Sequence, residues 1–204
     1  MSLDDWHLVF VFICLVLVLT AFSPVVMAYL RMKGEPFLAI AVLGEKEIAE
    51  HYFPGDDPDI DVEEEVHWTI YLYNHMGKAL YVAVRVKLLN STMLDPSSTT
   101  FNQSPSPIVY EVRRTLLNNE TWLYPFNWSL IKVSLDGNST IIEGLMINGE
   151  PIQTKVSAKN GYNFRMVFET WIYDETLKDF IFGFVSKEHS DCFWNQIWFN
   201  VTHA

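Results

Sequence analysis

Residues 66–89 read VHWTIYLYNHMGKALYVAVRVKLL, and this stretch decides the fold class. Apolar side chains occupy alternate positions on both sides of a central turn: Val66, Trp68, Ile70 and Leu72 before it, and Leu80, Val82, Val84, Val86 and Leu88 after it. Successive side chains of a strand point to opposite faces, so each half predicts a strand with one buried face. Residues 74–77, Asn-His-Met-Gly, tolerate positive φ, and we expect the two strands to form an antiparallel hairpin.

Short apolar runs continue outward from this stretch. They lie at residues 36–44, 108–116, 122–135, 140–147, 152–156, 163–173, 180–185 and 193–201. The Gly-containing pairs Asp136-Gly137, Asn148-Gly149 and Asn160-Gly161 separate several of them. Residues 45–61 and 90–107 have the composition of loops, and we expect the second of these to be exposed. Many short strands with this spacing predict a mainly β domain, an immunoglobulin-like antiparallel β-sandwich, over residues 35–204.

The N-terminal part has a different composition. The run from Leu8 to Leu30 contains no Asp, Glu, Lys or Arg. About 20 apolar residues in a helix span a hydrocarbon core, so this run predicts one transmembrane helix, with residues 1–34 as anchor and linker. A cleaved signal peptide is the alternative, because Val26-Met27-Ala28 resembles a cleavage site. The first seven residues carry no Lys or Arg, however, and the apolar run is too long for a signal.

Three residues of the predicted span should contact another membrane protein. Thr20, Ser23 and Pro24 combine hydroxyl groups with a carbonyl that a proline leaves unpaired. A neighbouring helix could satisfy these groups and approach closely over the small side chains. The alternative is that Thr20 and Ser23 bond only their own backbone.

Two signals for orientation conflict. Arg31 and Lys33 follow the predicted span, which on the positive-inside rule would place the large domain in the cytoplasm. Asn-x-Ser/Thr triplets, the acceptor sequence for N-linked glycans, begin at Asn90, Asn102, Asn119, Asn127, Asn138 and Asn200. Random order of the same residues would give about one or two such triplets. Large domains translocate largely regardless of flanking charge, so we expect a single-pass protein of the cell membrane with its glycosylated domain outside the cytoplasm.

Composition limits the classes of partner. The net charge of −11 argues against a nucleic-acid partner, because phosphates attract clustered Lys and Arg. A cationic partner is easier to accommodate. The two cysteines, Cys14 and Cys192, lie far apart in the sequence and are expected to stay unpaired.

No motif of a catalytic site or cofactor occurs in the sequence. G-x-S-x-G, a phosphate-binding glycine loop and H-E-x-x-H are all missing. His67 and His75 share a parity but lie ~26 Å apart along a strand, too far for one metal ion. Cys192 lacks the companion ligands of a copper site. The acidic run Asp56 to Asp61 could bind calcium, with a solvated loop as the alternative. We therefore expect neither an enzyme nor a cofactor.

Five segments carry a resemblance to a known family. They are PFLAIAVLG at 36–44, YFPGDD at 52–57, YLYNHMGKALYVAVRVKLL at 71–89, RMVFETWIYDETLKDFIFGF at 165–184 and CFWNQIWFNVT at 192–202. In this order they are similar to an uncharacterised, mainly archaeal family of membrane-anchored extracytoplasmic β-domains, a domain of unknown function. The resemblance implies an anchored β-domain in an archaeal setting and no catalytic residue.

Together these patterns predict a non-catalytic, membrane-anchored accessory or structural subunit of a membrane or cell-envelope protein complex. Its partners would be the lipid bilayer, N-linked glycans and membrane or envelope proteins reached through the helix and the outer domain. The alternative is a surface adhesion, S-layer-associated or archaellum-stator-like glycoprotein.

Overall fold

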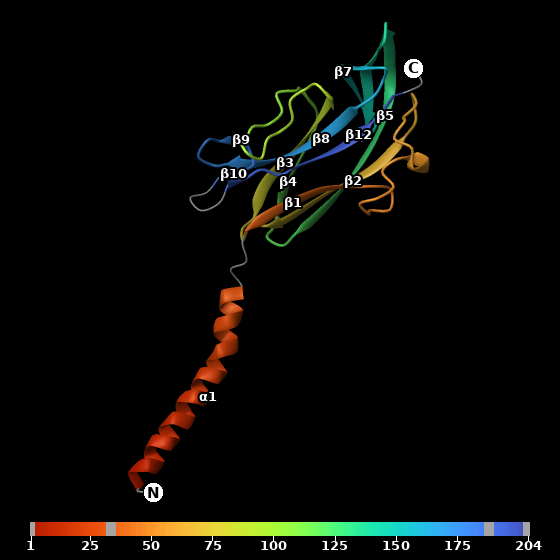
Figure 1. Ribbon diagram of the computed structural model, residues 1–204. Coiled ribbons are helices and arrows are strands. Elements are labelled where there is room, and N and C mark those ends of the chain that lie inside the picture. Colours follow the sequence, from red (N-terminus) through yellow and green to blue (C-terminus); the bar gives the residue numbers. More distant parts are fainter. Residues whose placement is uncertain (1–2, 32–35, 186–189, 202–204) are drawn as a thin grey trace. The chain divides into compact units, whose positions relative to one another are not determined.

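The computed structural model of the chain describes residues 3–31, 36–185 and 190–201. Internal contacts divide it into two units, Met1–Pro36 and Phe37–Ala204. The first unit contains one helix, α1 (Leu3–Arg31; Figure 1). Apolar side chains along it are exposed, among them Phe10 and Phe12 at 66% each. Among the residues whose side chains are described, no helix is both long enough and apolar enough to cross a membrane.

The second unit is made of antiparallel strands in two main sheets (Figure 1). The first sheet contains, in spatial order, β1 (Phe37–Leu43), β2 (Val66–His75), β5 (Thr121–Asp136), β6 (Ser139–Ile147) and β7 (Glu150–Lys159). The second contains β12 (Trp194–Phe199), β8 (Phe164–Asp174), β3 (Leu80–Asn90) and β4 (Ile108–Leu116), with β9 (Asp179–Phe182) paired to β8. A separate short pair joins β10 (Phe184–Val185) to β11 (Ser190–Asp191). The predicted mainly β, sandwich-like architecture is confirmed.

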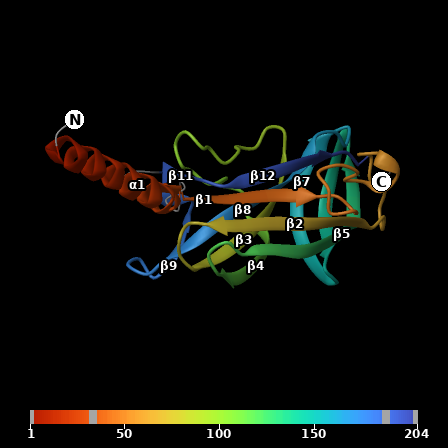
Figure 2. The same cartoon turned by 90° about the horizontal axis from the view of Figure 1, so that it is seen from below.

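The core lies between the two sheets, where their inner faces meet. All nine alternating apolar residues of β2 and β3 that the sequence assigned to one face are buried. Large aromatic rings fill the space between the two sheets. The ring centroid of Phe168 in the second sheet lies 6.0 Å from that of Trp68 and 5.3 Å from that of Phe126 in the first. At the sheet edges, β1 contacts β12 (Figure 2). Burial of a Trp or Phe contributes roughly 1.5–3 kcal/mol or more, so these rings dominate the cohesion of the domain.

The predicted hairpin of β2 and β3 is wrong. β2 pairs with β1 and β5, whereas β3 pairs with β4 and β8 in the other sheet. The chain crosses between the layers at the buried Asn74, whose Nδ2 donates to the carbonyls of Lys78, Leu116 and Leu117. Two strands with one apolar face each can pair side by side in one sheet or face each other from two sheets. Both arrangements bury the apolar faces, so alternation alone does not distinguish them.

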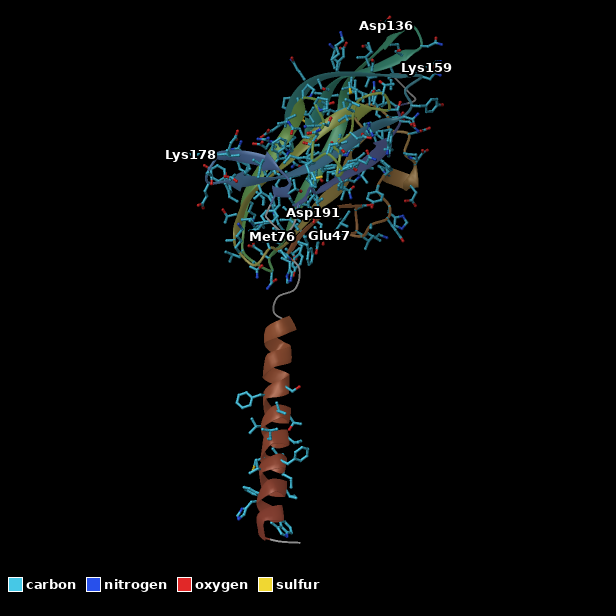
Figure 3. All side chains as sticks on the ribbon, turned by 60° about the vertical axis from the view of Figure 1, so that its left-hand side comes forward. Glu47, Met76, Asp136, Lys159, Lys178 and Asp191 are labelled. Atoms are coloured by element: carbon cyan, nitrogen blue, oxygen red, sulfur yellow. The ribbon has the colours of Figure 1, made fainter. Side chains whose placement is uncertain are left out.

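The other predicted turns occur where Gly follows Asp or Asn. Asn148 and Gly149 both have positive φ and join β6 to β7, as a two-residue hairpin requires. Asn160 and Gly161 also have positive φ, but they lead from β7 in the first sheet toward β8 in the second. Figure 3 shows Asp136 and Lys159 at the end of the domain opposite Met76.

The sequence predicted an exposed loop at residues 90–107. In the structure, residues 91–107 are instead held against the second sheet. The Lys87 side chain on β3 donates to the Ser104 carbonyl at 2.6 Å, and the Ser104 amide donates to the Glu169 carboxylate at 2.8 Å. Arg165 on β8 pairs with Asp95 and donates to the Met93 carbonyl. These charged groups fasten the segment against the outer face of the second sheet.

Candidate functional site on the outer face of the first sheet

Two histidines of β2 each contact a glycosylation-triplet asparagine beside β2. His75 Nδ1 lies 2.7 Å from Asn119 Oδ1, and His67 Nδ1 lies 3.0 Å from Asn127 Oδ1. An amide oxygen only accepts hydrogen bonds, so both imidazoles donate. The second pair is in direct register across β2 and β5. The histidines that the sequence singled out therefore do not converge; each orients an exposed asparagine at its own end of the sheet.

Aromatic rings surround the Asn119 end of this face. The centroids of Phe37 and His75 lie 5.0 Å apart, and those of Phe37 and Tyr73 lie 5.8 Å apart. The Tyr73 hydroxyl is 3.5 Å from Asn119 Oδ1. Phe37 is 42% exposed, so this ring group is a solvent-facing apolar platform beside the asparagine.

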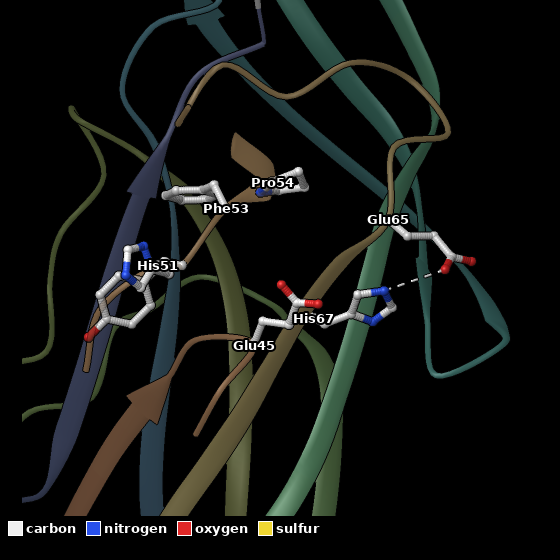
Figure 4. Close-up of a pocket in the computed structure, with 7 residues that line it drawn as sticks. Glu45, His51, Phe53, Pro54, Glu65 and His67 are labelled. Carbon is white, nitrogen blue, oxygen red and sulfur yellow. Dashed lines mark ion pairs between the residues drawn. The ribbon is translucent and has the colours of Figure 1, made fainter. Parts of the chain in front are cut away.

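A pocket of about 230 Å³ lies at the other end of the face (Figure 4). It is lined by side chains of β2 and of the preceding loop: Glu45, His51, Tyr52, Phe53, Pro54, Glu65 and His67. His67 Nε2 lies 3.8 Å from Glu65 Oε2 on one side, and His51 lies on the other, where its Nδ1 is 2.7 Å from Asp56 Oδ1. Carboxylates beside aromatic rings are suited to a cationic group, which they attract by charge and by cation–π contact.

The wall of the pocket is held by the core. The Trp68 indole donates to the Tyr52 carbonyl, and Phe53 packs edge-to-face on the Trp68 ring at 5.8 Å. Burial raises the pKa of Tyr52, and the negative charge of Glu50 raises it further. The loop is therefore positioned by a buried ring of β2.

The acidic run at Asp56 to Asp61 does not gather its carboxylates around one point. Asp57 accepts the backbone N–H of Asp59, and Asp59 accepts the side-chain amide of Asn200 at 2.7 Å. Across the described parts of the chain, no group of three or more His, Cys, Asp or Glu side chains could hold a metal ion.

The remaining triplet asparagines differ in how their amides are used. Asn90 is half-buried, and its Nδ2 donates to the Ser157 carbonyl at 2.7 Å while its Oδ1 accepts from residues 92 and 93. Asn200 is also half-buried, with Nδ2 on Asp59 and Oδ1 accepting the N–H of Asn163. Asn102 and Asn138 are exposed, and the Asn102 amide donates to Thr100.

The expected contact residues of the helix are only partly described. The Thr20 hydroxyl donates to its own helix, at 2.9 Å from the Val16 carbonyl and 3.0 Å from the Leu17 carbonyl. Ser23 is exposed, and the side chain of Pro24 lies outside the described side chains. The Thr20 hydroxyl therefore needs no hydrogen-bond partner on a neighbouring helix, and the predicted contact depends on Ser23 and Pro24.

Both cysteines are free. Cys192 is half-buried beside the 91–107 segment, with its sulfur 3.6 Å from the Ser97 carbonyl, and burial raises its thiol pKa. A protonated thiol is a weak nucleophile, so this residue is suited to packing.

Sequence reasoning missed the pocket. Its members Glu45 and His51 come from a loop whose path no periodicity reveals, although Glu65 and His67 share a parity with the other outward side chains of β2.

No protein-family model matches the chain, and no curated protein matches it. Among solved structures, a β-glucosidase from Listeria innocua is 11% identical with a TM-score of 0.34, the match covering 81% of this chain and 16% of that one. The sporulation control protein Spo0M from Bacillus subtilis is 9% identical with a TM-score of 0.36, over 80% of this chain and 49% of that one. The Bacteroides uniformis β-glucuronidase 2 is 9% identical with a TM-score of 0.30, over 80% of this chain and 13% of that one. Likenesses this distant carry no argument about function.

Proposed function

We propose that the chain is a non-catalytic accessory or structural subunit of a membrane or cell-envelope complex, anchored by residues 8–30 with its β-domain outside the cytoplasm. The observation that carries the proposal is the uncharged apolar sequence from Leu8 to Leu30. The structure assigns this run to α1, where Phe10, Phe12 and Phe22 are 61–66% exposed. A helix that is apolar on all sides needs a non-aqueous environment, which a bilayer provides.

The placement outside the cytoplasm is supported by the excess of glycosylation triplets, all of which follow residue 89. The immunoglobulin-like assignment is supported by strand order. β1-β2-β5 in one sheet faces β12-β8-β3-β4 in the other, so the second and third strands lie in different sheets, as in that fold. The β6–β7 hairpin then extends the first sheet at its far edge. Membership of the archaeal family of anchored β-domains remains a proposal from the quoted segments.

The pocket at Glu45 and Glu65 is the proposed point of contact with a partner. The domain is acidic as a whole, with a net charge of −11 for the chain, which favours a cationic partner. A Lys or Arg side chain would fit a pocket of about 230 Å³ and would meet two carboxylates and two aromatic rings there. The partner is therefore expected to present a basic residue on an exposed loop or terminus.

Extraction of native membranes in mild detergent tests the proposal. An accessory subunit should co-purify with a fixed set of membrane proteins, and Glu45→Gln/Glu65→Gln should weaken that association. Glu150→Gln, at an exposed position on β7, is the matched control and should leave it unchanged. Recovery with the surface lattice alone would instead support the layer-associated or adhesion alternative, and recovery of the chain in the soluble fraction would contradict the anchor.

A further inference from the structure

We propose that Asn119 and Asn127 carry N-linked oligosaccharides, whereas Asn90 and Asn200 carry none. This inference rests on the proposed function, because it requires the domain to lie outside the cytoplasm. It divides four of the six sequence triplets by the hydrogen bonds of their own side-chain amides.

The acceptor atom of the reaction is the amide nitrogen. A bond forms between Asn Nδ2 and the anomeric carbon of an oligosaccharide carried on a lipid phosphate. The bond from that carbon to the phosphate oxygen breaks, the phosphate leaves with the electron pair, and the amide gives up one proton. No oxidant or reductant is required. The reaction and its product therefore require an Nδ2 that has space around it.

Asn119 and Asn127 meet this requirement. Their oxygens are held by His75 and His67, at 2.7 and 3.0 Å, and among the described residues no acceptor is bonded to either Nδ2. Because the two halves of an amide point in opposite directions, a fixed oxygen directs the nitrogen away from the histidine. Both residues are exposed, so a glycan leaves the surface without displacing any side chain.

Asn90 and Asn200 do not meet it. Each is half-buried, and each Nδ2 lies 2.7 Å from an acceptor in another part of the chain, Ser157 for the first and Asp59 for the second. These bonds tie β3 to β7, and the residue that follows β12 to the acidic loop. A sugar at either nitrogen would push apart the segments that the amide joins.

The ring group beside Asn119 gives the glycan a surface to lie on. The ring centroids of Phe37, Tyr73 and His75 lie within 6.1 Å of one another. The C–H faces of a sugar ring are apolar and pack well on aromatic rings. A glycan at Asn119 would shield the 42% of Phe37 that is exposed.

Site-resolved glycopeptide mass analysis of the full-length protein from its own membranes tests the proposal. We expect glycan on the peptides of Asn119 and Asn127 and unmodified peptides for Asn90 and Asn200. Two threonine variants form a matched pair, because both residues are exposed and both end a triplet. Thr121→Ala should lower the intact mass by one glycan, and Thr92→Ala should leave the mass unchanged apart from the substitution.

Glycan at Asn90 or Asn200, or bare Asn119 and Asn127, would overturn the inference. Labelling of intact cells with a membrane-impermeant amine reagent separates its failure from that of the proposed function. If the domain is labelled and Asn119 and Asn127 are bare, the division of the triplets is wrong although the domain is outside. If the domain is labelled only after lysis, the orientation in the proposed function is wrong, and the inference falls with it.

Discussion

Lys87 Nζ lies 2.8 Å from Glu169 Oε2, and both side chains are buried, at 3% and 0% exposure. The pair lies on the outer side of the second sheet, where the backbone of Ser104 closes over it and the Trp171 indole donates to the same carboxylate at 3.1 Å. Charges hidden in this way are stabilised only while each keeps all its partners.

Removing one charge of this pair should strongly destabilise the domain. Lys87→Met leaves the Glu169 carboxylate buried without its cation, and we expect a loss of about 3–5 kcal/mol in the free energy of unfolding. Urea denaturation of the full chain in mild detergent, followed by tryptophan fluorescence, measures it. The control is Lys132→Met, which removes a surface pair at 2.7 Å with Glu143 and should cost less than about 1 kcal/mol. Equal losses in the two variants would contradict this reading.

Two glycines with positive φ should respond differently to alanine. Gly149 has a φ of +82° and open space where a Cβ would be, so Gly149→Ala should cost only the backbone strain of about 1–2 kcal/mol. At Gly161 the added carbon would overlap the Val201 carbonyl oxygen, so the backbone at Val201, beyond the end of β12, must also shift. We expect Gly161→Ala to cost about 1–3 kcal/mol more than Gly149→Ala by thermal or chemical unfolding. A larger loss at Gly149 would refute the close approach of Val201 to Gly161.

Tyr124 should be the tyrosine that ionises last. Burial and the hydroxyl of Tyr110 at 2.6 Å raise its pKa to about 12. A pKa raised in the folded state adds stability that is complete below the unfolded value of about 10 and is lost as pH rises toward 12. Ultraviolet titration of Tyr124→Phe should therefore lack the most alkaline phenolate step. Persistence of that step in the variant would assign it to another residue.

Glu111 should contribute to the acid sensitivity of the fold. Burial raises its pKa, but hydrogen bonds from Arg85 and Arg113 lower it by more, so the net shift is downward. A lowered pKa adds stability that is present above the unfolded value of about 4.3 and is lost as pH falls through the folded value. The stability lost between pH 6 and pH 3 should be smaller in Glu111→Gln than in the parent chain. An unchanged pH dependence would show that the ion pairs of Glu111 do not contribute.

The helix should contribute to partner contact at Ser23 and Pro24. Ser23→Leu/Pro24→Ala keeps the apolar run intact, and we expect it to reduce co-purification with membrane partners. Thr20→Val is the control, because the Thr20 hydroxyl bonds its own backbone and needs no neighbour. If both variants retain the same partners, the interface lies in the outer domain alone.

Alternation along β2 and β3 predicted the nine side chains that these strands bury between the two sheets. It did not predict that Ala83, Lys87 and Leu89, on the other face of β3, are buried as well. The same pattern could not predict which strands pair. Asn74 decides that point by bonding carbonyls of residues 78, 116 and 117, two of which are remote in the sequence. Partner choice depends on such long-range contacts, which no local pattern contains.

The candidate site was only partly accessible to sequence reasoning. The triplets gave all six asparagines the same standing, whereas Asn119 and Asn127 are exposed and Asn90 and Asn200 are half-buried. What separates them is the acceptor of each amide nitrogen, Ser157 or Asp59, from a distant part of the chain. The contact of His67 with Asn127 follows from the register of β2 on β5, and that of His75 with Asn119 from the turn before β5. Neither contact can be predicted from the local sequence.

β1 is the first strand after residue 36, so any pull transmitted along the chain from its N-terminal side enters the domain at Phe37. From there to Leu43 the strand is paired continuously with β2, from His75 back to Thr69. Hydrogen bonds between antiparallel strands run perpendicular to the strand axis. Tension along that axis therefore shears all of them together, whereas tension across it would peel them apart one after another from Phe37. The direction of the force thus decides whether β1 acts as a strong mechanical clamp or a weak one.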